Sequence, residues 1–171
     1  MRNKNVTMMT QAAIIAALYV VLTMIANALG LASYAIQVRF SEALCVLPYF
    51  TIAAVPGLYI GCLVANLLTG AAIWDILFGS LATLIGAIGT YLLRKHKFLM
   101  TLPPVIANAV IVPFVLRYGY QITWTYEGKD LAIPYFATTV GIGEIISVCV
   151  LGSMLLKVLL PYKNILFRQD K

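Results

Sequence analysis

The chain has 171 residues, of which 62% are hydrophobic and only 11% are charged. Soluble domains carry roughly 25% charged residues, so this composition excludes a soluble globular protein and predicts a single-domain, multi-pass protein of the cell membrane. The net charge of +6 comes from 12 Lys and Arg residues against 6 Asp and Glu residues. Because the basic residues lie at the ends of apolar segments, they indicate membrane topology rather than nucleic-acid binding.

The first half of the chain predicts three membrane helices. The first is expected over roughly 10–30 by its length and lack of charge. An uncharged run then joins Glu42 to Asp75, and it is too long for one crossing. The dipeptide Pro56-Gly57 near its middle predicts a tight hairpin between helices over roughly 40–55 and 57–71.

The second half predicts three more helices. The fourth starts after Asp75 and runs to the basic cluster that begins at Arg94, and the fifth covers about 99–116. Residues 118–133 form the longest polar stretch, with a turn expected at Glu127-Gly128-Lys129-Asp130. The sixth begins near Pro134, which suits a first helical turn, and ends around 157–161. The predicted fold is an all-α bundle of six transmembrane helices that forms one domain over 1–171.

The distribution of Lys and Arg predicts the orientation of this bundle. Nine of these residues flank the predicted spans on the side of both termini. Three, Arg39, Arg117 and Lys129, flank them on the other side. Positive residues concentrate in cytoplasmic segments, so both termini are expected in the cytoplasm, as short tails of about 1–9 and 161–171.

Glu144 and Asn108 are the strongest candidates for a substrate-binding site. Glu144 lies about ten residues into the sixth predicted helix, hence roughly 15 Å from its outer end. A carboxyl at that depth is costly and is by default a functional hypothesis, although it could also be protonated or hydrogen-bonded to a neighbouring helix. Asn108 in the fifth helix lies at a matching depth. Its amide needs a partner, either a ligand or another helix.

A mixed-charge, aromatic rim is predicted at the outer mouth. Arg39 precedes Glu42 by three residues, and Trp74 precedes Asp75. Further aromatic residues of the rim are Tyr118, Tyr120, Trp124 and Tyr126. Carboxylates for N–H donors and rings for stacking suit a flat, nitrogen-rich molecule. The alternatives are an interfacial aromatic belt for Trp74 and a local ion pair for Arg39 with Glu42.

The first predicted helix carries four alanines at a spacing that permits close helix packing. They form the overlapping pairs Ala12/Ala16 and Ala13/Ala17. Small residues four apart let another helix approach closely.

Motifs of the common enzyme classes are absent from the sequence. No G-x-x-x-x-G-K-[ST] phosphate loop and no H-E-x-x-H motif occurs, and His96, the single histidine, lies in a basic loop. The three cysteines are isolated within apolar runs and are expected to be core thiols. We therefore expect no catalytic residues, no metal site and no cofactor in this chain.

Two segments, VRFSEALCVLPYFTIAAVPGLYIGCLVANLL and WDILFGSLATLIGA, resemble the QueT family. These proteins are taken to be S-components, the substrate-binding subunits of energy-coupling factor (ECF) transporters, for queuosine precursors. The resemblance implies capture of a 7-deazaguanine, such as preQ1 (7-aminomethyl-7-deazaguanine) or queuine, from outside. It also implies partners: a transmembrane coupling protein and two ATPase subunits that use ATP. The protein would topple in the bilayer to deliver its substrate, with the alanine face of the first helix as the docking surface.

The resemblance gives the candidate residues specific roles. Glu144 would accept two adjacent N–H donors of the deazaguanine, and Asn108 would bond its carbonyl or pyrrole edge. Glu42 or Asp75 could neutralise the ammonium of an aminomethyl precursor, while Trp74 or Trp124 could stack on the ring. Two alternatives stay open: an S-component for another vitamin or nucleobase, and a self-sufficient secondary transporter with Glu144 as its proton site.

Overall fold

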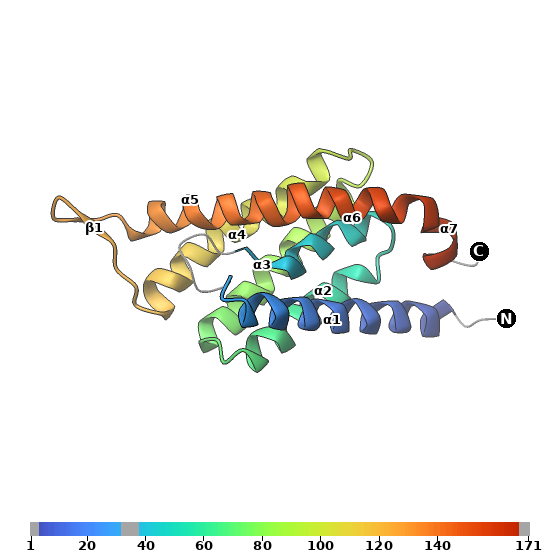
Figure 1. Ribbon diagram of the computed structural model, residues 1–171, viewed down its shortest axis with the longest axis horizontal. Helices are drawn as coiled ribbons and strands as arrows, with labels where there is room; N and C mark the ends of the chain where they lie inside the picture. The colour runs from blue at the N-terminus through green and yellow to red at the C-terminus, as the bar shows by residue number, and fades with distance from the viewer. Residues whose placement is uncertain (1–3, 32–37, 168–171) are drawn as a thin grey trace.

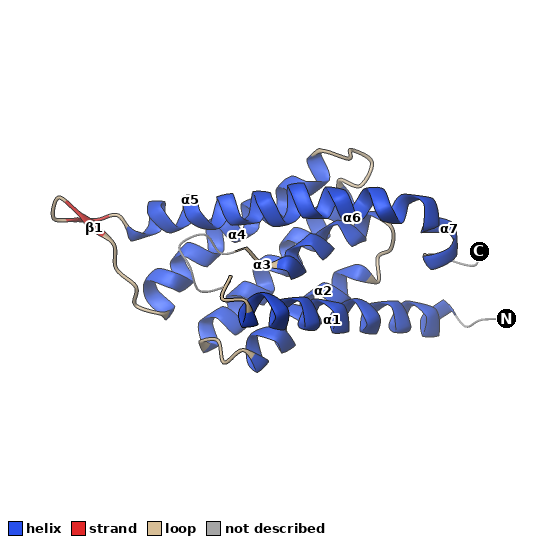
Figure 2. Cartoon of the chain, viewed as in Figure 1, coloured by secondary structure: helices blue, strands red, loops and turns tan. Residues whose placement is uncertain are grey.

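The computed structural model describes residues 4–31 and 38–167, and nearly all of these form helices (Figures 1 and 2). Parts of the predicted tails, and of the loop expected after the first helix, lie outside the described residues. A two-stranded hairpin is the single β element of the described part, with β1 (Thr125–Tyr126) antiparallel to β2 (Lys129–Asp130). It carries the turn predicted at Glu127-Gly128.

Six helical segments confirm the predicted all-α bundle. The first four are α1 (Lys4–Ala28), the 3₁₀ helix η1 (Phe40–Tyr49), α2 (Ala54–Leu68) and α3 (Ile73–Leu92). The fifth is continuous through η2 (Leu99–Thr101), α4 (Leu102–Phe114) and the π-helical η3 (Val115–Gly119). The sixth runs through α5 (Ala132–Glu144), the π-helical η4 (Ile145–Leu151), α6 (Gly152–Leu159), η5 (Leu160–Tyr162) and α7 (Lys163–Leu166).

Four of these segments are long and apolar enough to cross a membrane, and their outer faces are apolar. They are Lys4–Ala28, Ile73–Leu92, Leu99–Gly119 and Ala132–Leu166. Exposed side chains such as Ile14, Leu18 and Phe78 would face lipid. The composition and the structure together establish a multi-pass membrane protein.

The hairpin predicted at Pro56-Gly57 turns earlier than expected. Helix η1 ends at Tyr49 and α2 begins at Ala54, so the turn lies between them and Pro56 falls within the first turn of α2. Proline is tolerated there because the first N–H groups of a helix have no partner within it. Gly57 does not break the helix; because it has no side chain, it lets α2 come into close contact with α1.

Helix α2 packs against α1 through small residues on both helices. A Cβ atom added at Gly57 would lie 2.7 Å from the carbonyl oxygen of Ala12, and one added at Gly61 would lie 3.0 Å from Cα of Ala16. Such spacing permits backbone contact between helices in a membrane. The pair Ala12/Ala16 therefore packs against α2 within the protein.

Helix η1 is the centre of the bundle. Every residue from Ser41 to Pro48 is buried, and η1 contacts α1, α2, α3, α6 and η4. A 3₁₀ helix rises about 2.0 Å per residue, so its ten residues extend roughly 20 Å, where an α-helix would reach about 15 Å. This conformation explains how so short a segment passes through the core.

The start of α1 and helix α7 lie at one end of the bundle, and the β hairpin projects from the other (Figure 1). This arrangement agrees with an even number of crossings. That the termini lie on the cytoplasmic side stays a prediction from the Lys and Arg distribution.

Candidate functional site

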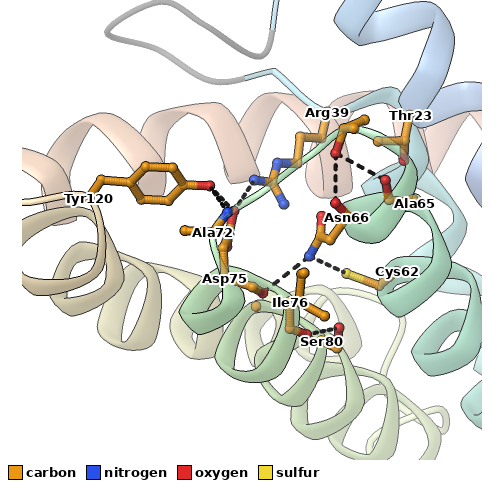
Figure 3. Close-up of polar contacts among 12 residues, drawn as sticks. Thr23, Arg39, Cys62, Ala65, Asn66, Ala72, Asp75, Ile76, Ser80 and Tyr120 are labelled. Carbon is orange, nitrogen blue, oxygen red and sulfur yellow. Dashed lines mark hydrogen bonds and ion pairs between the residues drawn. The ribbon is translucent and has the colours of Figure 1, made fainter.

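Asp75 interacts with Arg39 and with Tyr120, which come from two other parts of the chain (Figure 3). Its Oδ2 atom lies 3.7 Å from a terminal nitrogen of Arg39, which precedes η1, and accepts a hydrogen bond of 3.2 Å from the hydroxyl of Tyr120. The same hydroxyl accepts a bond of 3.1 Å from the N–H of Ala72. Partial burial raises the pKa of Tyr120, so the hydroxyl keeps its proton at neutral pH and can donate it to Asp75.

A polar cavity of about 240 Å³ opens beside Asp75 and Arg39. It lies among the C-terminal end of α1, the C-terminal end of α2 and the first turn of α3. Its lining residues are Thr23, Ala26, Asn27, Arg39, Asn66, Thr69, Gly70, Ala71, Asp75 and Tyr120. Asn66 donates a bond of 3.2 Å to the carbonyl oxygen of Asp75 and so fixes the start of α3 against α2.

Glu42 lies inside the bundle rather than on an open rim. Its side chain is 1% exposed. Its Oε1 atom accepts a hydrogen bond from the hydroxyl of Tyr19 on α1, and its Oε2 atom accepts one of 3.0 Å from the thiol of Cys45. A 3₁₀ helix has three residues per turn, so Glu42 and Cys45 lie on the same face of η1. The ion pair of Arg39 is made with Asp75, on another helix, and not with Glu42 as the local alternative required.

Glu144 and Asn108 come together in the core, as their equal depth indicated. Both are buried, and the amide of Asn108 lies beside the carboxyl of Glu144. Glu42 and Arg39 are also electrostatic neighbours of Glu144. Four buried polar atoms nevertheless lack a hydrogen-bond partner among the described residues: Asp75 Oδ1, Asn108 Nδ2, Glu144 Oε2 and Ser147 Oγ. Because an unpaired buried polar atom is costly, these atoms are candidates for ligand binding.

The aromatic residues predicted to form the rim do not lie around one site. Trp74 and Tyr118 line a separate apolar cavity of about 430 Å³ between α3 and the fifth helical segment, together with Phe78, Val110, Ile111, Phe114, Val115 and Gly119. Trp124 stacks on Tyr135 with a centroid distance of 4.6 Å. Neither tryptophan lines the polar cavity, whereas Tyr120 does. Stacking of a ligand on Trp74 or Trp124 remains a prediction.

The hairpin beside these aromatics is fixed by a second ion pair. A terminal nitrogen of Arg117 lies 2.6 Å from Oδ2 of Asp130. The other carboxylate oxygen of Asp130 accepts a bond of 3.1 Å from the N–H of Ala132, the first residue of α5. This backbone bond and the guanidinium lower the pKa of Asp130.

The alanine face of α1 is split by the packing of α2. Ala12 and Ala16 are partly buried against Gly57 and Gly61, while Ala13 and Ala17 are exposed. The part of the predicted docking surface that stays open is therefore the pair Ala13/Ala17.

Sequence reasoning missed several residues that complete the site. Tyr19 and Cys45 donate hydrogen bonds to Glu42, and the bond that Tyr120 donates to Asp75 joins residues 45 positions apart. Thr23 donates a bond of 2.9 Å to Ser41, which fixes the start of η1 to α1. The one available signal was the spacing of Glu42 and Cys45, which is meaningful once η1 is known to be a 3₁₀ helix.

Within the described ranges, no three His, Cys, Asp or Glu side chains are grouped so that they could hold a metal ion. A protein-family model described as QueT transporter matches residues 9–161. Comparison with curated proteins gave no match, and comparison with solved structures also gave none. The family match covers most of the helical bundle and all of the buried polar residues described above. QueT is a transporter family and not an enzyme family, and this chain, a multi-pass membrane protein, belongs to it.

Proposed function

We propose that this transporter is the S-component of an ECF importer and binds a queuosine precursor of the 7-deazaguanine class. The observation that carries the proposal is that Asn108 Nδ2, Glu144 Oε2 and Ser147 Oγ are buried without a hydrogen-bond partner among the described residues. These atoms comprise one amide donor, one carboxylate acceptor and one hydroxyl.

The edge of a 7-deazaguanine is complementary to these atoms. Its ring N–H and exocyclic amine are adjacent donors, which a carboxylate such as Glu144 accepts as a pair. Its ring carbonyl accepts a bond from an amide such as that of Asn108. The cavity beside Arg39 and Asp75 would admit the ligand from the hairpin side, which the Lys and Arg distribution assigns to the outside.

Delivery would depend on partner proteins. The chain has no phosphate-binding loop, so ATP hydrolysis would belong to two ATPase subunits joined to a transmembrane coupling protein. The exposed Ala13/Ala17 face of α1 would dock on that coupling protein, and the bundle would topple to bring the site to the cytoplasm.

The decisive experiment is calorimetric binding to the purified protein in detergent. We expect submicromolar binding of 7-aminomethyl-7-deazaguanine, weaker binding of guanine, which presents the same edge but lacks the aminomethyl group, and no binding of riboflavin or thiamine. Preference for one of the comparison ligands would replace the ligand assignment and leave the S-component role. Binding of none of the four would remove the assignment to this ligand class.

A second measurement tests the role of Glu144. Glu144→Gln keeps the shape of the side chain but replaces one acceptor with a donor, and a lost hydrogen bond to a charged group costs about 1.5–3 kcal/mol. We expect binding to weaken by roughly 10–100-fold. Glu127→Gln, at the exposed hairpin, is the matched control and should bind as the parent does. Equal affinity for Glu144→Gln and the parent would exclude the paired-donor role.

The proton-coupled alternative makes opposite predictions. Reconstituted alone in vesicles, a secondary transporter would accumulate substrate when a proton gradient is applied, without ATP. The S-component should accumulate none under these conditions and should co-purify with ATPase subunits from its native membrane.

A further inference from the structure

The apolar cavity between α3 and the fifth helical segment is a groove that faces the membrane. Its volume is about 430 Å³. Val115 in its lining is buried, whereas Phe78 and Phe114 are exposed on the outer faces of the two helices. The groove is therefore continuous with the apolar surface that a multi-pass protein presents to lipid.

Close contacts between the two helices bound this groove. At the hairpin end, a Cβ atom added at Gly119 would lie 3.0 Å from Cβ of Trp74. Beyond the other end, a Cβ atom added at Gly86 would lie 2.7 Å from Cα of Pro104. Residues 74 and 86 lie roughly 18 Å apart along α3 at 1.5 Å per residue. The helices approach closely at these two points, and the groove lies between them.

The size of the groove suits a hydrocarbon chain and not a helix. Over roughly 18 Å, a helix 10 Å wide occupies about 1,400 Å³, which far exceeds the groove. A chain about 4 Å wide, the contact distance between carbon atoms, occupies roughly 230 Å³ over the same length. The hydrocarbon core of a bilayer is about 30 Å thick, so the groove matches the length of an acyl chain within one leaflet.

The chemistry of the lining agrees with this occupant. None of the described residues that line the groove is charged. Trp74 stacks with Phe78 on one wall at a centroid distance of 6.1 Å, and Phe114 stacks with Tyr118 on the other at 6.4 Å. A nucleobase would leave its polar groups unpaired between such walls, whereas an acyl chain has none to pair. Trp74 and Tyr118 lie at the hairpin end of their spans, where these residue types meet the lipid headgroups.

The charged residues next to the groove in the sequence are already paired. Arg117, which precedes Tyr118, forms an ion pair with Asp130. Asp75, which follows Trp74, forms one with Arg39. Neither pair leaves a net charge that would select a headgroup.

We propose that this groove is a lipid-binding site that holds one acyl chain of a phospholipid from the leaflet on the hairpin side. The site selects its ligand by the chain and not by the charge of the headgroup. The lipid reaches the groove by lateral movement within the bilayer. This inference goes beyond the proposed function and does not depend on which substrate the transporter carries.

The test uses Trp74 as a reporter of the occupied groove. The chain has two tryptophans, so Trp124→Phe leaves Trp74 as the single one and keeps an aromatic ring against Tyr135. The purified, delipidated variant is titrated in detergent with phosphatidylcholine brominated in the glycerol-proximal half of one chain, because bromine quenches indole fluorescence on contact. We expect quenching that saturates at a single lipid per protein. Quenching that rises without saturation would overturn the site, since it would reflect general solvation by lipid.

Unbrominated competitors test the selection by the chain. Phosphatidylcholine and phosphatidylglycerol with identical chains should reverse the quenching equally. Stronger reversal by the anionic phosphatidylglycerol would overturn the independence from headgroup charge.

Two variants on α4 locate the chain. Val110 lines the groove and Ile106 does not, although both are 57% exposed. In the Trp124→Phe background, Val110→Phe should fill the groove and weaken the saturable quenching at least tenfold, while Ile106→Phe should leave it unchanged. Equal quenching in the two variants would overturn the groove as the binding place.

Light scattering tests the competing occupant, a second copy of the chain. A dimer that forms in the parent and is lost in Val110→Phe would overturn the lipid assignment. If Val110→Phe does not fold, the titration and the competition on the Trp124→Phe protein decide the proposal by themselves.

Discussion

The polar groups buried on the two sides of η1 differ in whether they have hydrogen-bond partners. Toward α1, each polar side chain has a partner: Tyr19 bonds Glu42, Thr23 bonds Ser41, and Thr51 at the following turn bonds Gln11. Toward α4 and η4, Asn108, Glu144 and Ser147 keep unpaired atoms in the described structure. Each unpaired buried group costs about 1–3 kcal/mol, so under the proposed function the first side is structural and the second binds the ligand. The contrast indicates where substitutions should change stability and where they should change affinity.

The largest effect is expected at the contact between α1 and α2. Gly57→Ala places a Cβ atom 2.7 Å from the carbonyl oxygen of Ala12, a backbone atom that cannot move without separating the helices. We expect destabilisation by about 1–3 kcal/mol, as for other overpacked contacts, measured as a fall in Tm in detergent. Gly141→Ala is the control, because its nearest neighbour, Cβ of Ala109, lies at an ordinary 3.8 Å. A Tm for Gly57→Ala equal to that of the control would show that this side is not tightly packed.

Two asparagines test the contrast more directly. Asn66→Leu leaves the carbonyl of Asp75 without its side-chain donor and should lower stability by about 1–2 kcal/mol. Asn108→Leu removes an unpaired amide and should leave Tm unchanged or raised. It should instead weaken binding of 7-aminomethyl-7-deazaguanine about tenfold, the value of one hydrogen bond of about 1.4 kcal/mol. The opposite pattern, with Asn108→Leu unstable and unaltered in affinity, would make Asn108 a packing residue.

A smaller effect is expected from Tyr120→Phe. The change removes the bonds between the Tyr120 hydroxyl, Asp75 and the N–H of Ala72. At this partly exposed position each bond contributes about 0.5 kcal/mol, so the two together contribute about 1 kcal/mol. Amide exchange of the segment between α2 and α3 should accelerate about fivefold, which mass spectrometry can measure. Tyr118→Phe, two residues earlier and exposed, should exchange as the parent does. Unchanged exchange in Tyr120→Phe would mean that this hydroxyl does not fix the segment.

The smallest effect concerns the pH dependence of the hairpin. The pKa of Asp130 is lowered in the folded protein by the N–H of Ala132 and by Arg117. A lowered pKa means that the carboxylate stabilises the fold above its ordinary pKa of about 3.9 and that this stabilisation is lost as the pH falls through the lowered value. Amide protection at the start of α5, corrected for intrinsic exchange, should decrease on acidification from pH 5 to pH 3. Asp130→Asn should abolish that dependence, and a dependence that persists would assign it to another group.

The sequence predicted the six helical segments and the shared depth of Asn108 and Glu144, because both follow from local pattern and length. It placed the hairpin turn wrongly, because Gly57 looks like a helix breaker locally but is required by a contact with Ala12 on another helix. It grouped Trp74 with Asp75, yet successive helical residues point about 100° apart, and the structure places Trp74 in an apolar cavity and Asp75 in a polar one. The pairs Arg39–Asp75 and Tyr120–Asp75 join distant positions, so no local pattern contains them.

The 3₁₀ form of η1 has a consequence for the geometry of the site. Three residues per turn place Glu42, Cys45 and Pro48 in one straight row along the helix. In an α-helix the same residues would be displaced by about 60° at each step of three. Rewinding η1 would therefore turn the carboxylate of Glu42 relative to the proline and shorten the segment by roughly 5 Å. The orientation of this acid is thus set by the winding of the helix that bears it as well as by its hydrogen bonds to Tyr19 and Cys45.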